Sequence, residues 1–169
     1  MKGWCMAAGV CLALAASVAR ADGMLSPTAV RCIQKAAAYH GVNVSIMMAI
    51  ARHESRGNAF TVVRNRNQSK DFGISGINSI HLKELGRFGI GPAELLDECV
   101  SSYVGAWHYS KKVHKHGNTW TAVGAYHSET PYFNERYQRL IHNELVDMGV
   151  LKGMKLSVPP LRRPASGGH

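Results

Sequence analysis

Residues 45–58 have the sequence SIMMAIARHESRGN, and the predicted fold is organised around this stretch. One face of a helix through it carries residues at positions i, i+3, i+4 and i+7, which are Met47, Ile50, Ala51 and Glu54. The first three side chains are apolar, so this face should point to a hydrophobic core. The Gly-Asn pair at 57–58 ends the helix. The pattern therefore predicts that Glu54 lies on the buried side of a helix's last turn.

Glu54 is a candidate general acid because of this predicted position. Desolvation raises the pKa of a carboxyl group, and the negative end of a helix dipole raises it further. A glutamic acid that keeps its proton near neutral pH can donate that proton in catalysis. The alternative is an ion pair between Glu54 and a neighbouring cation such as Arg52 or Arg56. This stretch alone leaves both interpretations open.

The two ends of the chain indicate where the protein works. The 169 residues, with a formal net charge of +9, fit one domain, and residues 1–21 predict a secretory signal peptide. Its apolar stretch is shorter than the roughly 20 residues of a spanning helix, and a retained membrane anchor is the alternative. Cleavage would remove Lys2 and Arg20, which lowers the net charge to +7. The expected product is a periplasmic chain without an integral membrane segment.

Two of the four cysteines remain after this cleavage. Cys5 and Cys11 leave with the signal peptide, whereas Cys32 and Cys99 stay in the mature chain. An even pair of cysteines in an exported protein predicts one disulfide, and two separate buried thiols are the alternative. A metal site built on this pair alone is not expected, because the chain lacks the CxxC spacing.

The mature chain is predicted to be mainly α, with residues 22–150 as a single domain. Periodicity and capping residues predict helices at 27–40, after Asn43, and at 79–87, 99–116, 119–126 and 132–148. Residues 61–71 lose this periodicity and predict a polar loop or a small hairpin. Residues 151–169 are rich in Pro, Gly and basic side chains, which predicts a flexible basic tail.

Several other chemistries are not supported by the spacing of the residues. His53-Glu54 begins like the zinc motif HExxH, but Gly57 stands where the second histidine is required. His108 and His114 would lie on nearly opposite faces of one helix, so no metal or other cofactor is predicted. Nucleic-acid binding is also not predicted, because the basic chain is exported and carries no such motif. A basic exported protein is more naturally expected to meet an anionic polymer of the cell envelope.

Five segments in fixed order resemble the lysozyme-like lytic transglycosylases. They are Cys32, AIARHESRGN at 49–58, DFGISGIN at 71–78, VGAW at 104–107 and AVGAY at 122–126. The chain is most similar to the small specialised members that accompany type III and type IV secretion, conjugation and pilus systems. The resemblance extends from about residue 25 to 148. It implies a lysozyme-like α+β fold and, as partners, peptidoglycan glycan strands and components of such a system.

The resemblance also implies a role for individual residues. Glu54 would be the sole catalytic acid and base, cleaving between N-acetylmuramic acid and N-acetylglucosamine with formation of a 1,6-anhydro ring. Ser55 would help to position Glu54 or the substrate. The other expected substrate-binding residues are Gly73, Ile77, Asn78, Tyr126 and His127. The cysteines that match Cys32 and Cys99 commonly form a disulfide in this family.

The chain departs from the family pattern at two positions. Gly76 stands where the family usually has Gln, and His127 stands where it usually has Asn. We expect a changed contact with the glycan, which His127 could partly replace through its ring nitrogens or, alternatively, could leave unfilled while capping a helix. Two other functions stay open: a muramidase that uses Asp71 or a water, and a non-catalytic wall-binding assembly factor. Asp71 itself is interpreted as a loop-organising residue.

Overall fold

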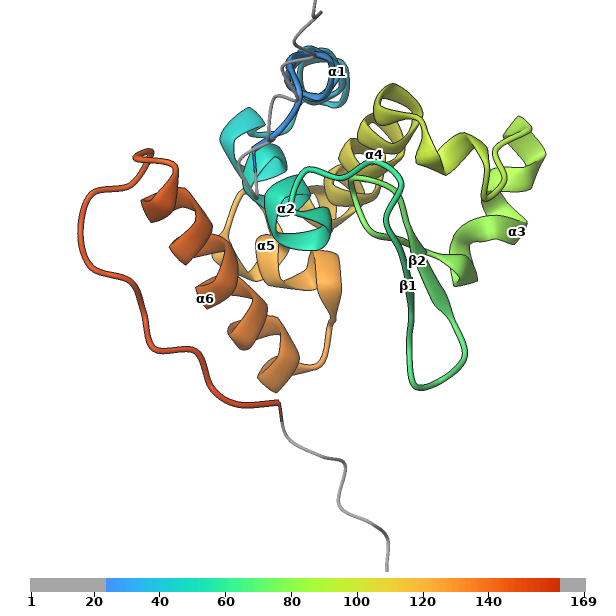
Figure 1. The fold of residues 1–169 in the computed structure, drawn as a ribbon. Coiled ribbons are helices and arrows are strands. Elements are labelled where there is room, and N and C mark those ends of the chain that lie inside the picture. Colours follow the sequence, from blue (N-terminus) through green and yellow to red (C-terminus); the bar gives the residue numbers. More distant parts are fainter. Residues whose placement is uncertain (1–23, 162–169) are drawn as a thin grey trace, which may run out of the picture.

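The computed structural model describes residues 24–161, and Figure 1 shows its ribbon. The predicted signal peptide at 1–21 and the end of the predicted tail, 162–169, lie outside the described residues. The α-helices are α1 (Pro27–His40), α2 (Val44–Ser55), α3 (Leu82–Leu85), α4 (Glu98–His116), α5 (Trp120–His127) and α6 (Pro131–Asp147). Short 3-10 helices are η1 (Ser79–His81), η2 (Gly86–Phe88) and η3 (Glu94–Leu96). The predicted mainly α fold class is confirmed.

The predicted starts of the first two helices are confirmed by their capping contacts. The Ser26 hydroxyl accepts a hydrogen bond from the Ala29 N–H at 2.9 Å, and Pro27 follows as the first helical residue. Gly41 ends α1 in the left-handed region with a φ of 65°. The Asn43 side chain then accepts hydrogen bonds from the first N–H groups of α2. Local sequence signals therefore fix where both helices begin.

The core confirms the face predicted for α2. Met47, Ile50 and Ala51 are each at most 1% exposed, and they pack in the main cluster with residues of α1, α4, α5 and α6. A second, smaller cluster under the sheet contains Phe72, Ile77, Leu85, Leu95 and Val104. Figure 1 shows α2 near the centre of the helical part. Glu54 therefore lies one turn beyond Ile50 and Ala51, on the face of α2 that the core holds rigidly.

The predicted polar segment forms a hairpin. Strand β1 (Val62–Arg64) pairs antiparallel with β2 (Lys70–Phe72), and β2 pairs with β3 (Ile77–Asn78), in the order β1-β2-β3. The register places Val63 opposite Asp71, and Asp71 opposite Asn78. Figure 1 shows the hairpin extending away from the helices. The hairpin thus forms a separate wall beside the helical part.

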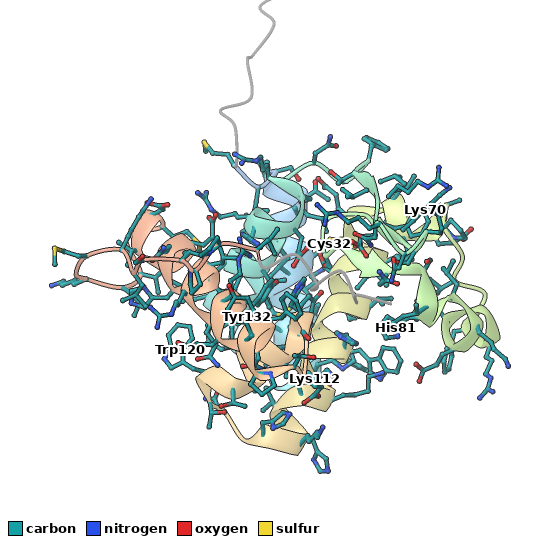
Figure 2. The ribbon with its side chains drawn as sticks, turned by 90° about the horizontal axis from the view of Figure 1, so that it is seen from below. Cys32, Lys70, His81, Lys112, Trp120 and Tyr132 are labelled. Atoms are coloured by element: carbon teal, nitrogen blue, oxygen red, sulfur yellow. A yellow bond between two sulfur atoms is a disulfide. The ribbon has the colours of Figure 1, made fainter. Side chains whose placement is uncertain are left out.

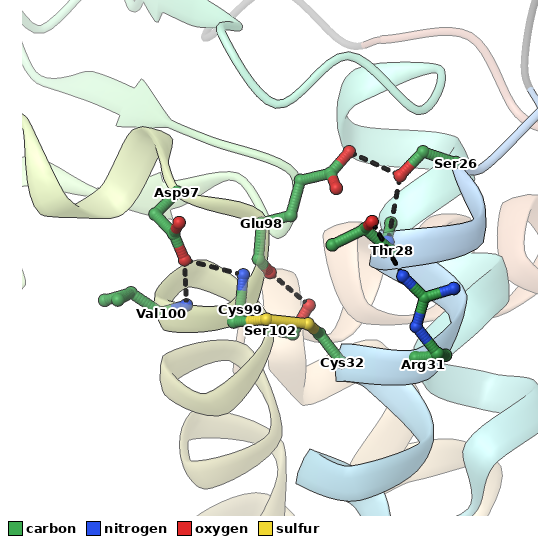
Figure 3. The surroundings of a disulfide bond; sticks show 10 residues. Ser26, Thr28, Arg31, Cys32, Asp97, Glu98, Cys99, Val100 and Ser102 are labelled. Carbon is green, nitrogen blue, oxygen red and sulfur yellow. Dashed lines mark hydrogen bonds between the residues drawn. A yellow bond between two sulfur atoms is a disulfide. The ribbon is translucent and has the colours of Figure 1, made fainter.

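A disulfide joins α1 to the first turn of α4, as predicted. Cys32 and Cys99 are bonded, and their Cα atoms lie 4.9 Å apart (Figure 3). Asp97 caps α4 by accepting hydrogen bonds from the N–H groups of Cys99 and Val100. The Ser26 hydroxyl, which caps α1, also donates to the Glu98 carboxylate at 2.6 Å. The starts of two helices far apart in sequence are therefore held together by covalent and polar contacts.

The chain after α6 runs back beside that helix in Figure 1. The guanidinium of Arg136 donates to the Pro159 carbonyl at 2.9 Å, and that of Arg139 donates to the Ser157 carbonyl at 3.1 Å. Asn143 exchanges two hydrogen bonds with the backbone of Leu156. Within residues 24–161, no helix has the length and apolar character that a membrane span needs. The predicted domain boundary at residue 150 stays a prediction.

Candidate active site

A cleft of about 580 Å³ lies between the sheet and the helices α4 and α5. The sheet side contributes Asn65, Arg66, Asn67, Ser69, Asp71, Gly76, Ile77 and Asn78. The helical side contributes Ile80, His81, Val104, Trp107, His108, Lys112 and residues 125–129. Figure 2 labels His81 and Lys112. Glu54 also lines this cleft, so the cleft contains the predicted acid.

Glu54 is half-buried in the last turn of α2 and carries a raised pKa. Burial raises the pKa of Glu54 to about 7; a hydrogen bond from Tyr137 opposes this rise, and the charge of Asp71 adds to it. The alternative ion pair with Arg52 is not formed, because Arg52 pairs with Glu144 at 3.2 Å. At neutral pH a substantial fraction of Glu54 is therefore protonated and able to act as an acid.

Tyr137 from α6 holds one oxygen of the Glu54 carboxyl. Its hydroxyl donates to Oε1 of Glu54 at 2.5 Å. The ring of Tyr137 stacks on the ring of His127, with centroids 5.1 Å apart and planes 4° apart. His53 contacts the same ring edge-on, with centroids 5.4 Å apart. The hydroxyl is thus aimed by aromatic neighbours, and Oε2 is the carboxyl oxygen that Tyr137 leaves available.

Tyr137 lies at helical spacing within the predicted helix 132–148, and this spacing indicates a core residue, not a partner of Glu54. It is indeed 2% exposed, and its ring packs in the main cluster. A buried tyrosine hydroxyl usually needs a hydrogen-bond partner, and this requirement was the available signal. The partner lies 83 residues away in the sequence, which no local pattern reveals.

Gly76 packs its backbone directly against Glu54. Its φ is +60°, and a Cβ added to it would lie 2.7 Å from Oε2 and 3.0 Å from Cγ of Glu54. Both the conformation and the contact therefore favour glycine. The resemblance alone indicates only a lost glutamine contact at this position. The geometry adds a reason for glycine itself, because Gly76 covers the carboxyl that acts as the candidate acid.

Tyr126 positions the loop that contains Gly76. Its buried hydroxyl donates to the Ser75 carbonyl at 2.7 Å, and its ring stacks on Tyr137 with centroids 6.3 Å apart. Gly73 lies at the other end of this loop with a φ of +70°, and a Cβ there would lie 1.9 Å from the Leu95 carbonyl oxygen. The loop is therefore held between η3, α5 and the end of α2.

Asp71 is engaged by two amide groups. Its Oδ1 accepts a hydrogen bond from the Asn78 amide at 2.6 Å, and its Oδ2 accepts one from the Asn65 amide at 2.8 Å. Asn78 also accepts the Ile80 N–H, which caps η1. These contacts fit the interpretation of Asp71 as a loop-organising residue.

The predicted substrate-binding residues fall into two groups. Ile77, Asn78, Tyr126 and His127 line the cleft. Ser55 is buried, donates to the Ala51 carbonyl at 2.8 Å and accepts the Gly57 N–H at 3.1 Å, so it holds the end of α2. Neither Ser55 nor Gly73 is among the described residues that line the cleft. Ser55 and Gly73 would therefore affect the substrate indirectly, because they fix the positions of Glu54 and of the loop at 73–78.

Three histidines line the cleft and are mostly uncharged at neutral pH. Burial, as the largest cause, together with the charges of His81 and Lys112 lowers the pKa of His108 to about 4. Burial lowers the pKa of His127, whose ring stacks on that of Tyr137, and the charge of Asp71 opposes this shift. His81 also has a lowered pKa, chiefly through burial. In the described part of the chain, no group of three potential metal ligands occurs.

Comparison with known proteins shows the family of this chain. Residues 31–138, more than half of the chain, match the transglycosylase SLT domain. The chain belongs to this family. The matched segment contains Glu54, the loop at 73–78, Tyr126 and Tyr137.

Three relatives illustrate how far the similarity extends. "Invasion protein IagB" of Salmonella typhimurium is 37% identical over 100 residues, which are 59% of this chain and 62% of the relative. "Protein IpgF" of Shigella sonnei is also 37% identical over 100 residues, covering 59% of this chain and 66% of the relative. "X polypeptide" of Escherichia coli K12 is 30% identical over 129 residues, covering 76% and 70%. The chain thus spans slightly less than two thirds of the first two relatives.

Proposed function

We propose that the chain is a peptidoglycan lytic transglycosylase. It would cleave the β-1,4 bond between N-acetylmuramic acid and N-acetylglucosamine and close a 1,6-anhydro ring on the muramic sugar. The observation that carries this proposal is Glu54, a carboxyl group with a pKa of about 7 that lines a large cleft. Membership of the SLT family supports the same reaction.

The first step is protonation of the leaving group. Tyr137 donates to Oε1 of Glu54, so the acidic proton resides on Oε2. That proton passes to the glycosidic oxygen as the bond from this oxygen to the anomeric carbon breaks. N-acetylglucosamine leaves as an alcohol, and the muramic sugar acquires oxocarbenium character. The hydrogen bond from Tyr137 then stabilises the carboxylate that has formed.

The second step returns the proton to Glu54. The carboxylate takes the proton of the 6-hydroxyl of the same muramic sugar, and the 6-oxygen forms a bond to the anomeric carbon. The anhydro ring closes, and Glu54 is protonated again for the next cycle. Ordinary glycosidases need two carboxylates, whereas here the nucleophile belongs to the substrate.

The other carboxylates of the cleft favour this one-carboxyl mechanism over a muramidase. Asp71 already accepts two amide hydrogen bonds, at 2.6 Å and 2.8 Å. Glu129 pairs with Lys112, Lys115 and His116, which lower its pKa to about 2. Asp71 is therefore engaged by two amides and Glu129 by three cations, which favours the 6-hydroxyl of the substrate as the nucleophile.

We place this activity in the periplasm, after export by the predicted signal peptide. There the enzyme would open the wall locally for a secretion, conjugation or pilus apparatus, as the resemblance implies. One relative is named an invasion protein, which supports a link to such an apparatus. Peptidoglycan glycan strands are the proposed substrate, and components of the apparatus are the proposed partners.

The test is mass spectrometry of purified sacculi after digestion by the full chain. We expect anhydro-muropeptides as the main products and a loss of about 10²–10⁴-fold in rate for Glu54→Gln. Glu135→Gln, which removes an exposed carboxylate that pairs with Arg139 on α6, is the matched control.

Three other outcomes of this experiment would contradict the proposed role of Glu54 or favour another function. Substantial residual cleavage by Glu54→Gln contradicts its assignment as the acid. An excess of reducing muramic ends favours the muramidase. Binding of sacculi by the native chain without any cleavage favours the wall-binding assembly factor.

A further inference from the structure

The tip of the β1–β2 hairpin carries three exposed cations, Arg64, Arg66 and Lys70, which we call the hairpin cations. Within residues 24–161, the ion pairs join other residues, and none of the hairpin cations takes part in one. Arg64 instead donates a hydrogen bond to the neutral side chain of Gln68. On the other wall of the cleft, Lys112 pairs with Glu129 at 3.0 Å. Arg66 is thus the cleft-lining cation without an ion pair among the described residues, and Arg64 and Lys70 lie beside it on the hairpin, outside the cleft lining.

The hairpin contains one carboxylate, and it does not neutralise these charges. Asp71 is the single acidic residue between positions 61 and 73. Asp71 lines the cleft, its two oxygens accept hydrogen bonds from the neutral amides of Asn65 and Asn78, and none of the hairpin cations forms an ion pair with it. A cluster of like charges without counter-charges attracts anionic ligands. The hairpin therefore presents a positive potential to solvent and to the cleft beside it.

The tip is also well ordered by its own hydrogen bonds. The Asn65 N–H donates to the Ser69 carbonyl at 2.8 Å, and the Gln68 N–H donates to the Asn65 carbonyl at 3.1 Å. The Asn67 side chain accepts hydrogen bonds from the N–H and the hydroxyl of Ser69. A preorganised backbone lowers the entropy that binding must remove. The cations thus extend from a fixed platform.

The location of the hairpin tip beside the cleft indicates which anionic ligand it could bind. Arg66, Asn67 and Ser69 line the same cleft as Glu54. Figure 2 shows Lys70 at the periphery of the molecule. A glycan strand that fills the cleft would therefore project its substituents towards the hairpin cations. In peptidoglycan those substituents are stem peptides, which carry carboxylates.

We propose that the hairpin cations bind the carboxylates of peptidoglycan stem peptides, so that the chain prefers peptide-bearing glycan to bare glycan. This proposal rests on the proposed function, because it needs a glycan strand in the cleft. Exposed ion pairs are individually weak, so three of them together give a preference of about tenfold, and each gives about threefold or less. Salt screening should reduce the preference.

The experiment measures binding, so it does not depend on turnover. The full chain with Glu54→Gln is titrated calorimetrically with soluble, uncrosslinked glycan strands, and with the same strands after an amidase has removed their peptides. The readout is the ratio of the two dissociation constants. We expect a ratio of about ten, a fall of about threefold with added Arg66→Gln, and loss of the preference with all three hairpin cations changed to Gln.

The matched control is Arg87→Gln, which removes an exposed cation on η2 that does not line the cleft. It should keep the full ratio. An unchanged ratio in the Arg66→Gln and triple variants, or equal binding of both strands by the parent chain, overturns the proposal and leaves the hairpin cations for an acidic protein partner. If neither strand binds the parent chain, the proposed function fails as well, which distinguishes the two failures.

Discussion

Replacing Gly76 tests whether the backbone of the loop at 73–78 holds the carboxyl group of Glu54, the proposed acid. At a φ of +60°, a residue with a Cβ is strained by about 1–2 kcal/mol. At Gly76 the added Cβ would also lie 2.7 Å from Oε2 of Glu54. Either the loop or the carboxyl group of Glu54 must then shift. A shift of the carboxyl group would also disturb the hydrogen bond that Tyr137 donates to its Oε1. Gly76→Ala should therefore cost more stability than backbone strain alone.

The matched control is Gly89→Ala. Gly89 has a φ of +70° but no atom within 4 Å of its added Cβ, so its replacement isolates the backbone strain. We expect Gly89→Ala to lower the free energy of unfolding by about 1 kcal/mol and to leave sacculus cleavage near the native rate. Gly76→Ala should lower stability further and reduce cleavage by about 10–100-fold, since displacement of a catalytic group by about 1 Å can cost that much.

Gly76→Gln makes the test sharper because it introduces the residue that the family usually has at this position. We expect it to be at least as damaging as Gly76→Ala, since its Cβ meets the same atoms. Thermal unfolding gives the stability, and mass spectrometry of released anhydro-muropeptides gives the rate. Equal effects of Gly76→Ala and Gly89→Ala, or faster cleavage by Gly76→Gln, would refute this reasoning.

Three further predictions follow from the titration of Glu54 and from the disulfide. Tyr137→Phe removes the hydrogen bond that lowers the pKa of Glu54, so the loss of cleavage with rising pH should move to higher pH; a shift to lower pH contradicts the assigned contact. Glu54→Gln should stabilise the chain by up to about 3 kcal/mol above pH 7, because the folded state raises the pKa from 4.5 to about 7 and disfavours the carboxylate; the gain should vanish below pH 4.5, and equal gains at pH 4 and pH 8 would argue against it. Reduction of the Cys32–Cys99 bond, which spans 67 residues, should remove about 4 kcal/mol of stability, and an unchanged melting temperature contradicts this.

The raised pKa of Glu54 follows from features that the sequence already contains. The spacing of Met47, Ile50 and Ala51 fixed which face of α2 is buried, and Glu54 shares that face. Capping residues such as Asn43 fixed where the helix begins. These signals are local, since helical periodicity and caps depend on residues within a few positions of one another. The disulfide was also predictable, because export leaves one pair of cysteines.

The partners of Glu54 were decided by the tertiary structure. Tyr137 comes from α6, 83 residues along the chain, and periodicity could assign it only to a buried face. The need for glycine at position 76 depends on how closely its loop approaches α2. Arg66 likewise lacks an ion pair in the described chain because Asp71 accepts its hydrogen bonds from the amides of Asn65 and Asn78 and not from a cation. A sequence pattern specifies which face of an element is buried. The packing of distant elements decides which atoms are in contact at that face, and the chemistry of this site depends on those contacts.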